Sequence, residues 1–217
     1  MKINDNELNN IIKDKLSSDL EISNLSNITI LKIDFIFNYV ELLKIPSLEE
    51  LRFNSIEIEE GLLQVLNQLP NLKRLYFINC DINSLEVLDN KLELLYIERC
   101  KLSFTALNKF NKLKSLSLVE MDNIDLNSIS VIKNIENINF LNSKIINEDS
   151  LIYLNKVVKF CITGIVDIDN LIGIDSLKKL VIDEDVYSSN LDVVKYLINK
   201  GVDVTNIYGE SFGDING

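Results

Sequence analysis

The chain repeats one short spacing of apolar residues along most of its length. In each copy, an apolar residue is followed by two variable positions, a second apolar residue, one variable position and a third apolar residue. The copies, which lie 20 to 24 residues apart, start at Ile28, Leu48, Leu72, Leu92, Leu113, Ile135, Val157 and Leu177. The last part of the spacing has the period of a strand with one buried face. The pattern therefore predicts short strands at nearly constant separation.

A second apolar pair precedes most of these copies. Its members are separated by two residues, which is the spacing of one turn of an α- or 3₁₀-helix. The pairs are Leu66/Leu69, Leu85/Leu88, Leu107/Phe110, Ile129/Ile132, Leu151/Leu154 and Leu171/Ile174. One strand and one helical turn cannot bury an apolar face alone, so the units must stack on one another. The second unit is longer and predicts a true α-helix over residues 59–66.

Two consecutive copies extend the spacing to a cysteine and one more apolar residue. They are Leu72–Ile82, which contains Cys80, and Leu92–Leu102, which contains Cys100. In this form the chain resembles the leucine-rich repeat family, and in particular its short bacterial repeats. The resemblance covers residues 28–187. It implies an α/β solenoid of about eight repeats, with a curved parallel sheet on the concave face and short helices or 3₁₀ turns on the convex face.

The position of that cysteine departs from the family pattern in the other repeats. The family places Asn or Cys there, and the asparagines form a ladder that satisfies backbone groups in the turn. The other repeats of this chain hold Ile36, Ile56, Met121, Ser143, Ile165 and Asp185. We therefore expect the asparagine ladder to be absent and individual repeats to be irregular.

Both ends of a solenoid need a cap, since a bare end exposes its core. Residues 1–27 are expected to form the N-terminal cap, with an amphipathic helix over 5–20 that begins at Asp5. Residues 188–217 are expected to form the C-terminal capping helix and tail, with the helix over 190–201 closed by Gly201. Residues 209–217 have little apolar content, and we expect them to fray.

The strand register decides which side chains leave the concave face. In each strand, the residues between the apolar positions should point outward, which places Tyr76 and Tyr96 side by side. The predicted binding surface, called the concave patch below, consists of Arg74, Tyr76, Ile78, Leu94, Tyr96, Glu98, Val119 and Leu141. Tyr and Arg beside exposed aliphatic side chains are typical of binding hot spots. The alternative is that β-propensity alone places Tyr, Ile and Val on strands.

Charge narrows the choice of partner. Lys and Arg number 22 against 33 Asp and Glu, which gives a net charge of −11 at pH 7. So acidic a surface disfavours direct nucleic-acid binding and would suit a basic protein, although it also serves solubility alone. The first residues form no apolar signal segment, and no stretch is long enough to span a membrane. The odd count of 3 cysteines favours a reducing, cytoplasmic setting.

The residues that most enzymes need are missing from the sequence. It contains no histidine, which removes Ser-His and Cys-His pairs and most zinc sites. Glycine-rich phosphate-binding loops are absent as well. Cys80 and Cys100 should stack in adjacent repeats as small buried residues, although a disulfide or thiol metal site is conceivable. Cys161 falls at an outward position and could be exposed and reactive. We expect no catalysis, no cofactor and no metal.

Four functions remain to be weighed. The first is a protein-protein interaction module that binds another protein, possibly basic, on its concave face. The second is a small acidic inhibitor or immunity-type protein that neutralises a basic toxin, nuclease or other foreign effector. A regulatory piece of an enzyme and a cell-surface adhesin are the third and fourth. The missing signal, anchor and disulfides count against the adhesin.

Overall fold

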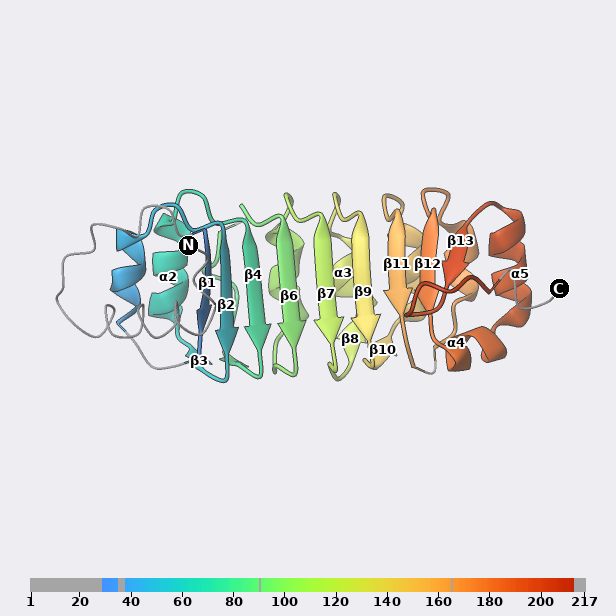
Figure 1. Ribbon diagram of the computed structural model, residues 1–217, viewed down its shortest axis with the longest axis horizontal. Helices are drawn as coiled ribbons and strands as arrows, with labels where there is room; N and C mark the ends of the chain where they lie inside the picture. Colours follow the sequence, from blue (N-terminus) through green and yellow to red (C-terminus); the bar gives the residue numbers. More distant parts are fainter. Residues whose placement is uncertain (1–28, 35–37, 90, 165, 213–217) are drawn as a thin grey trace, which may run out of the picture.

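The computed structural model describes residues 29–34, 38–89, 91–164 and 166–212, and nine parallel strands in these ranges form one sheet. The strands are β1 (Ile30–Ile33), β2 (Glu50–Asn54), β4 (Arg74–Ile78), β6 (Leu94–Glu98), β7 (Ser115–Val119), β9 (Asn137–Leu141), β11 (Lys159–Ile162), β12 (Lys179–Ile182) and β13 (Asp203–Thr205). Each strand pairs with the next one along the chain, as Figure 1 shows from the sheet side. All eight predicted strands are confirmed, and β13 is a ninth that was not predicted.

Helices of the central repeats lie behind the strands in Figure 1, on the other face of the sheet. The described helices are η2 (Tyr39–Lys44), α2 (Glu60–Gln68), η3 (Phe104–Lys109), α3 (Leu126–Ser130), η4 (Glu148–Tyr153), η5 (Asp169–Gly173), α4 (Glu184–Ser189) and α5 (Leu191–Asn199). Of these, α2 lies towards the N-terminal end of the sheet, and α4 and α5 lie at its C-terminal end. Most of the helices are 3₁₀ or α-helices of five or six residues, and five of the six apolar pairs begin in such a helix or in α2, while Leu85/Leu88 forms only a hydrogen-bonded turn. The longest helix of the array is α2, which confirms the predicted helix in the longer repeat. None of the helices described here is a candidate membrane span.

The core is a continuous row of apolar side chains between the sheet and the helices. Strand residues alternate, so that Leu75 and Phe77 of β4 are fully buried while their neighbours are partly exposed. Aromatic rings extend this row across repeats, and the rings of Phe53 and Phe77 stack with centroids 5.7 Å apart. Each repeat thus buries its apolar face against the next one, which is the stacking that the repeat length requires.

A sharp turn follows each of the central strands. The first residue after the strand adopts the left-handed conformation, with φ between 50° and 57° where it is not glycine. These residues are Ser55, Asn79, Arg99, Glu120 and Asn142. Beyond them, short strands pair in twos: β3 (Glu57–Ile58) with β5 (Asp81–Ile82), and β8 (Ile124–Asp125) with β10 (Ile145–Ile146). The turn therefore redirects the chain from the sheet to the convex side in a regular way.

The C-terminal end is closed by α4, α5 and β13. The predicted helix over 190–201 is confirmed as α5, and Gly201 follows it with a φ of 90°. The prediction that the chain frays from residue 209 is wrong up to Phe212, which is 3% exposed and stacks on Tyr187 with ring centroids 4.2 Å apart. The segment is held by the buried ring of Phe212 and by hydrogen bonds of Asn206 with Glu210 and of the Phe212 N–H with the carbonyl of Val204. The predicted N-terminal helix over 5–20 lies outside the described residues.

Candidate functional site

The sheet register brings most of the concave patch together. Strands β4 and β6 pair so that Arg74 lies beside Leu94, Tyr76 beside Tyr96, and Ile78 beside Glu98. Each of these six side chains is half-buried, so each retains contact with solvent. The predicted juxtaposition of the two tyrosines is thus observed, on the face of the sheet that the helices leave uncovered.

Two tyrosines and one arginine form a stack across three strands. The rings of Tyr76 and Tyr96 have centroids 5.4 Å apart and planes tilted by 33°, within the range of favourable aromatic pairs. The guanidinium of Arg52, on β2, lies 4.5 Å from the centroid of the Tyr76 ring, which is a cation–π contact. The surface formed by these three side chains therefore includes β2, which lies one repeat before the strands of the predicted patch.

Glu50 holds the two arginines of this surface. Its side chain is buried, at 6% exposed. Its carboxylate accepts hydrogen bonds from Nε of Arg52, at 2.6 Å, and from Nε of Arg74, at 2.9 Å. Arg74 also lies 3.6 Å from the exposed carboxylate of Glu49. A buried carboxylate with two charged donors fixes both guanidinium groups in place.

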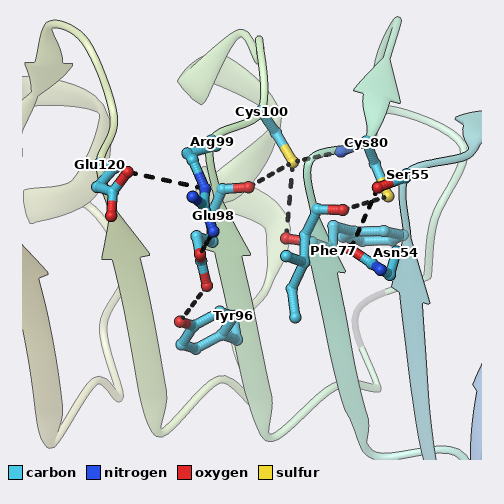
Figure 2. A network of polar contacts seen from close by, with 10 residues as sticks. Asn54, Ser55, Phe77, Cys80, Tyr96, Glu98, Arg99, Cys100 and Glu120 are labelled. Carbon is cyan, nitrogen blue, oxygen red and sulfur yellow. Dashed lines mark hydrogen bonds and ion pairs between the residues drawn. The ribbon is translucent and has the colours of Figure 1, made fainter.

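A second carboxylate holds the other end of the stack (Figure 2). The hydroxyl of Tyr96 donates to Oε2 of Glu98 at 2.7 Å, and Arg99 forms an ion pair with the same carboxylate. Arg99 also reaches Glu120, with Nε 3.7 Å from Oε2. Desolvation raises the pKa of Tyr96, and the hydrogen bond to Glu98 and its charge raise it further. Tyr96 therefore stays protonated and continues to donate to Glu98 at neutral pH.

Tyr76 has a raised pKa for similar reasons. Burial makes the largest contribution and the charge of Glu50 the next, while Arg52 and Arg74 act in the opposite direction. Both tyrosines are thus neutral hydrogen-bond donors with apolar rings.

The concave patch does not extend as far as predicted. Val119 is 8% exposed, so the prediction of an outward apolar strip through it is wrong, while Leu141 is half-buried. Val119 lies in register between Glu98 and Leu141, and its side chain is buried. The exposed part of the patch therefore centres on β2, β4 and β6.

Cys161 is buried, and the prediction that it could be exposed is wrong. It lies between Asn139 and Val181 in register and is 8% exposed. Desolvation raises the pKa of its thiol, so little reactive thiolate forms at neutral pH.

Cys80 and Cys100 serve the turns. The backbone N–H of Cys80 donates to Sγ of Cys100 at 3.3 Å, and the Cys100 thiol donates to the carbonyl of Glu98 at 3.2 Å (Figure 2). The neighbouring Cys100 side chain lowers the pKa of Cys80, and the neighbouring Cys80 side chain raises the pKa of Cys100. Both cysteines are free. Sulfur therefore takes the place of the amide that an asparagine ladder would supply.

Other side chains take the same part in later repeats. Oγ of Ser143 accepts from the backbone N–H of Met121 at 3.0 Å, and Oγ1 of Thr163 accepts from that of Asn142 at 2.9 Å. Oδ2 of Asp183 accepts from the N–H of Gly164 at 2.8 Å. In place of an asparagine ladder, a mixture of thiol, hydroxyl and carboxylate groups accepts the backbone hydrogen bonds of the turns.

The described residues offer little to metal or acid–base chemistry. Among them, no group of three or more cysteine and carboxylate side chains is arranged to hold a metal ion. The arrangement in β2, β4 and β6 instead presents two partly exposed aromatic rings and two guanidinium groups to solvent, which are groups that bind by contact.

Three residues of this surface were not in the predicted patch. Arg52 contacts Tyr76, Glu50 accepts a hydrogen bond from Arg74, and Arg99 forms an ion pair with Glu98. A signal existed for Glu50, since the repeat spacing already placed it beside Arg74 in the neighbouring strand. Its burial could not be predicted, because it depends on both arginines folding over it.

Comparisons with known proteins bear on the fold. No family model matches the sequence, and the search of curated proteins finds no match. Among solved structures, the chain is similar to an internalin from Listeria monocytogenes, with 20% identity and a TM-score of 0.58. The match covers 86% of this chain and 57% of the internalin, so the chain spans less than two thirds of that protein.

Two further solved structures are similar at lower scores. An internalin C2 from the same species is 19% identical, with a TM-score of 0.46 over 76% of this chain and 83% of that one. A leucine-rich repeat protein from Leptospira interrogans is 14% identical, with a TM-score of 0.45 over 85% of this chain and 55% of that one. At such identities the similarity concerns the fold alone. Of these three structures, the first internalin alone has a TM-score above 0.5.

Proposed function

Since this chain is a leucine-rich repeat solenoid, we propose that it is a non-enzymatic interaction module that binds a partner protein on its concave face. The observation that carries the proposal is the stack of Arg52, Tyr76 and Tyr96, held at its two ends by the carboxylates of Glu50 and Glu98. Tyr and Arg are the residue types that most often dominate binding energy at protein interfaces.

Preorganisation supports this reading. Binding a partner costs free energy for every side chain that must be ordered at the interface. Tyr96 is already held by Glu98, and Arg52 and Arg74 are held by Glu50, so these side chains lose little freedom on binding. The absence of histidine from the sequence supports the non-enzymatic part of the proposal.

The test is a capture experiment with matched tyrosine variants. Tagged wild-type protein is used to recover partners from a lysate of its own host, beside Tyr76→Ala/Tyr96→Ala. The control is Tyr196→Ala/Tyr208→Ala, which removes two well-exposed tyrosines outside the concave patch. We expect one protein to be recovered by the wild type and the control, and to bind the first variant at least about 10-fold more weakly. Equal recovery by all three would contradict the site.

A second candidate rests on the edge of the sheet at which the strands end. The turns after β7, β9, β11 and β12 carry ten acidic residues against one lysine, Lys144. They are Glu120, Asp122, Asp125, Glu148, Asp149, Asp167, Asp169, Asp183, Glu184 and Asp185. Burial raises the pKa of Glu148, and the neighbouring charges of Asp167 and Asp149 raise it further, which indicates a negative potential there.

This acidic edge favours the alternative of a small inhibitor or immunity-type protein that neutralises a basic toxin, nuclease or other foreign effector. Charge complementarity of that kind speeds association and makes it sensitive to salt. Raising the salt concentration from about 50 to 500 mM should then weaken binding of the captured partner by about 10-fold or more. An affinity that does not change with salt would exclude the inhibitor alternative. Binding through the aromatic and arginine side chains of the concave patch would then remain as the proposal.

A further inference from the structure

A groove lies on the opposite edge of the molecule, where the convex helices lead back into the strands. It is lined by the turn that joins α3 to β9 and by the turn that joins η4 to β11, and its volume is about 440 Å³. This is within the range of ligand pockets in proteins, about 300 to 1,000 Å³. The groove is formed by two successive repeats and shares no residue with the concave patch.

The groove has an apolar floor and exposed apolar walls. Ile132, Ile135 and Leu154 line it and are buried by the core. Val131 and Tyr153 also line it, one from each repeat, and they are 49% and 62% exposed. Large apolar side chains that stay this exposed on both sides of a hollow leave surface that a further apolar group could cover.

The charge around the groove is opposite to that of the protein as a whole. Lys133 and Lys156 line it, and no Asp or Glu is among the lining residues. Nζ of Lys156 bonds to Oδ1 of Asn134 at 2.9 Å, so its ammonium group is held at the rim. Neither lysine is in an ion pair with any described residue. In a chain of net charge −11, the groove thus places two lysines and no lining carboxylate beside apolar surface.

We propose that this groove is a second docking site, which binds a peptide segment of a partner protein that carries an aromatic side chain next to carboxylates. The ring would enter between Val131 and Tyr153, where it covers exposed apolar surface and can pack on the tyrosine ring. The carboxylates would pair with Lys133 and Lys156, whose charges no described carboxylate neutralises. A basic or purely apolar segment would leave the two ammonium groups unpaired or repelled.

The probe is a capped peptide of sequence Gly-Phe-Glu-Glu-Gly, titrated into the isotopically labelled full chain and followed through backbone amide NMR shifts. We expect saturable shifts at concentrations up to about 1 mM, centred on residues 130–135 and 153–156. The same peptide with glutamines in place of the glutamates should bind at least about 5-fold more weakly, because it lacks the charges.

Variants separate this site from general electrostatic attraction. Lys133→Glu/Lys156→Glu should weaken peptide binding by about 10-fold or more, and Tyr153→Ala should weaken it by removing one wall. The matched control, Lys101→Glu/Lys144→Glu, makes the same charge change at exposed positions that follow β6 and β9, and it should alter binding less than about 2-fold. Dispersed amide spectra verify that each variant is folded.

Three results would overturn the proposal. They are no saturable shift in the wild type, shifts centred outside the groove, and equal loss of binding in the two double-lysine variants. Each result leaves the concave patch untouched, since the groove and the patch are tested by different substitutions.

Discussion

The guanidinium of Arg52 lies 4.5 Å from the centre of the Tyr76 ring, although 24 positions separate the two residues in the sequence. The contact arises because β2 and β4 pair in register, with Arg52 directly beside Tyr76. A cation over an aromatic face at such a partly exposed site contributes about 0.5 to 1 kcal/mol. The repeat length thus converts distant positions into one continuous surface across β2, β4 and β6.

Glu50 should be the residue whose loss most disturbs that surface. Glu50→Gln removes the charge that holds Arg52 and Arg74, and we expect it to destabilise the fold by about 1 to 2 kcal/mol. The expected loss of stability is no larger than this because both arginines are partly exposed, so that water can hydrate their guanidinium groups once the charge of Glu50 is removed. Urea denaturation measures the change. Glu49→Gln, at an exposed carboxylate next to it, should change stability by less than about 0.5 kcal/mol, and similar losses in the two variants would refute the role given to Glu50.

The raised pKa of Tyr96 predicts a loss of stability at alkaline pH. The pKa is higher in the folded state than the ordinary value of 10.0, so the unfolded chain loses its proton first as the pH rises. The stabilisation is therefore fully present below about pH 10 and is lost as the pH rises towards the folded pKa. Unfolding free energies measured between about pH 8 and 11 should show this fall, and Tyr96→Phe should reduce it. An identical pH dependence in Tyr96→Phe would show that another group is responsible.

Ser143 should be needed for the turn after β7. Ser143→Ala leaves the backbone N–H of Met121 without its acceptor in a buried position, which should cost about 1 to 3 kcal/mol. Ser143→Cys should recover part of this loss, because the sulfur of Cys100 does the same in an earlier repeat. Thermal unfolding of the two variants provides the comparison. Equal stability of the alanine and cysteine variants would mean that the hydrogen bond contributes little.

Phe212 should anchor the C-terminal cap. Its ring is buried against Tyr187, so Phe212→Ala should destabilise the protein by about 3 to 5 kcal/mol. Tyr208→Ala is the control, since that side chain is 83% exposed and should matter by less than about 0.5 kcal/mol. Chemical denaturation distinguishes the two variants. If Phe212→Ala were as stable as the wild type, the segment after β13 would not contribute to the stability of the fold.

The sequence predicted the strands and their register well, because both depend on apolar spacing. Leu75 and Phe77 repeat at the period of a half-buried strand, and the constant repeat length leaves only one way to align neighbours. The pairing of Tyr76 with Tyr96 followed from that alignment alone.

Side-chain burial on the concave face was harder to predict. Val119 and Cys161 occupy the expected outward positions of their strands but are buried, and this depends on how the surrounding side chains pack. The role of Glu50 depends on two arginines converging on it, and that of Phe212 on the position of α4. Such features come from tertiary packing, which periodicity does not encode.

The central claim is that a partner protein covers the concave patch. Once a partner has been captured, hydroxyl-radical footprinting of the purified complex measures the exposure of each tyrosine directly. We predict that oxidation of Tyr76 and Tyr96 falls at least about 5-fold on binding, since hot-spot residues are desolvated at an interface, while Tyr208 is oxidised as in the free protein. Unchanged oxidation of Tyr76 and Tyr96 in a complex that is fully formed would contradict the claim.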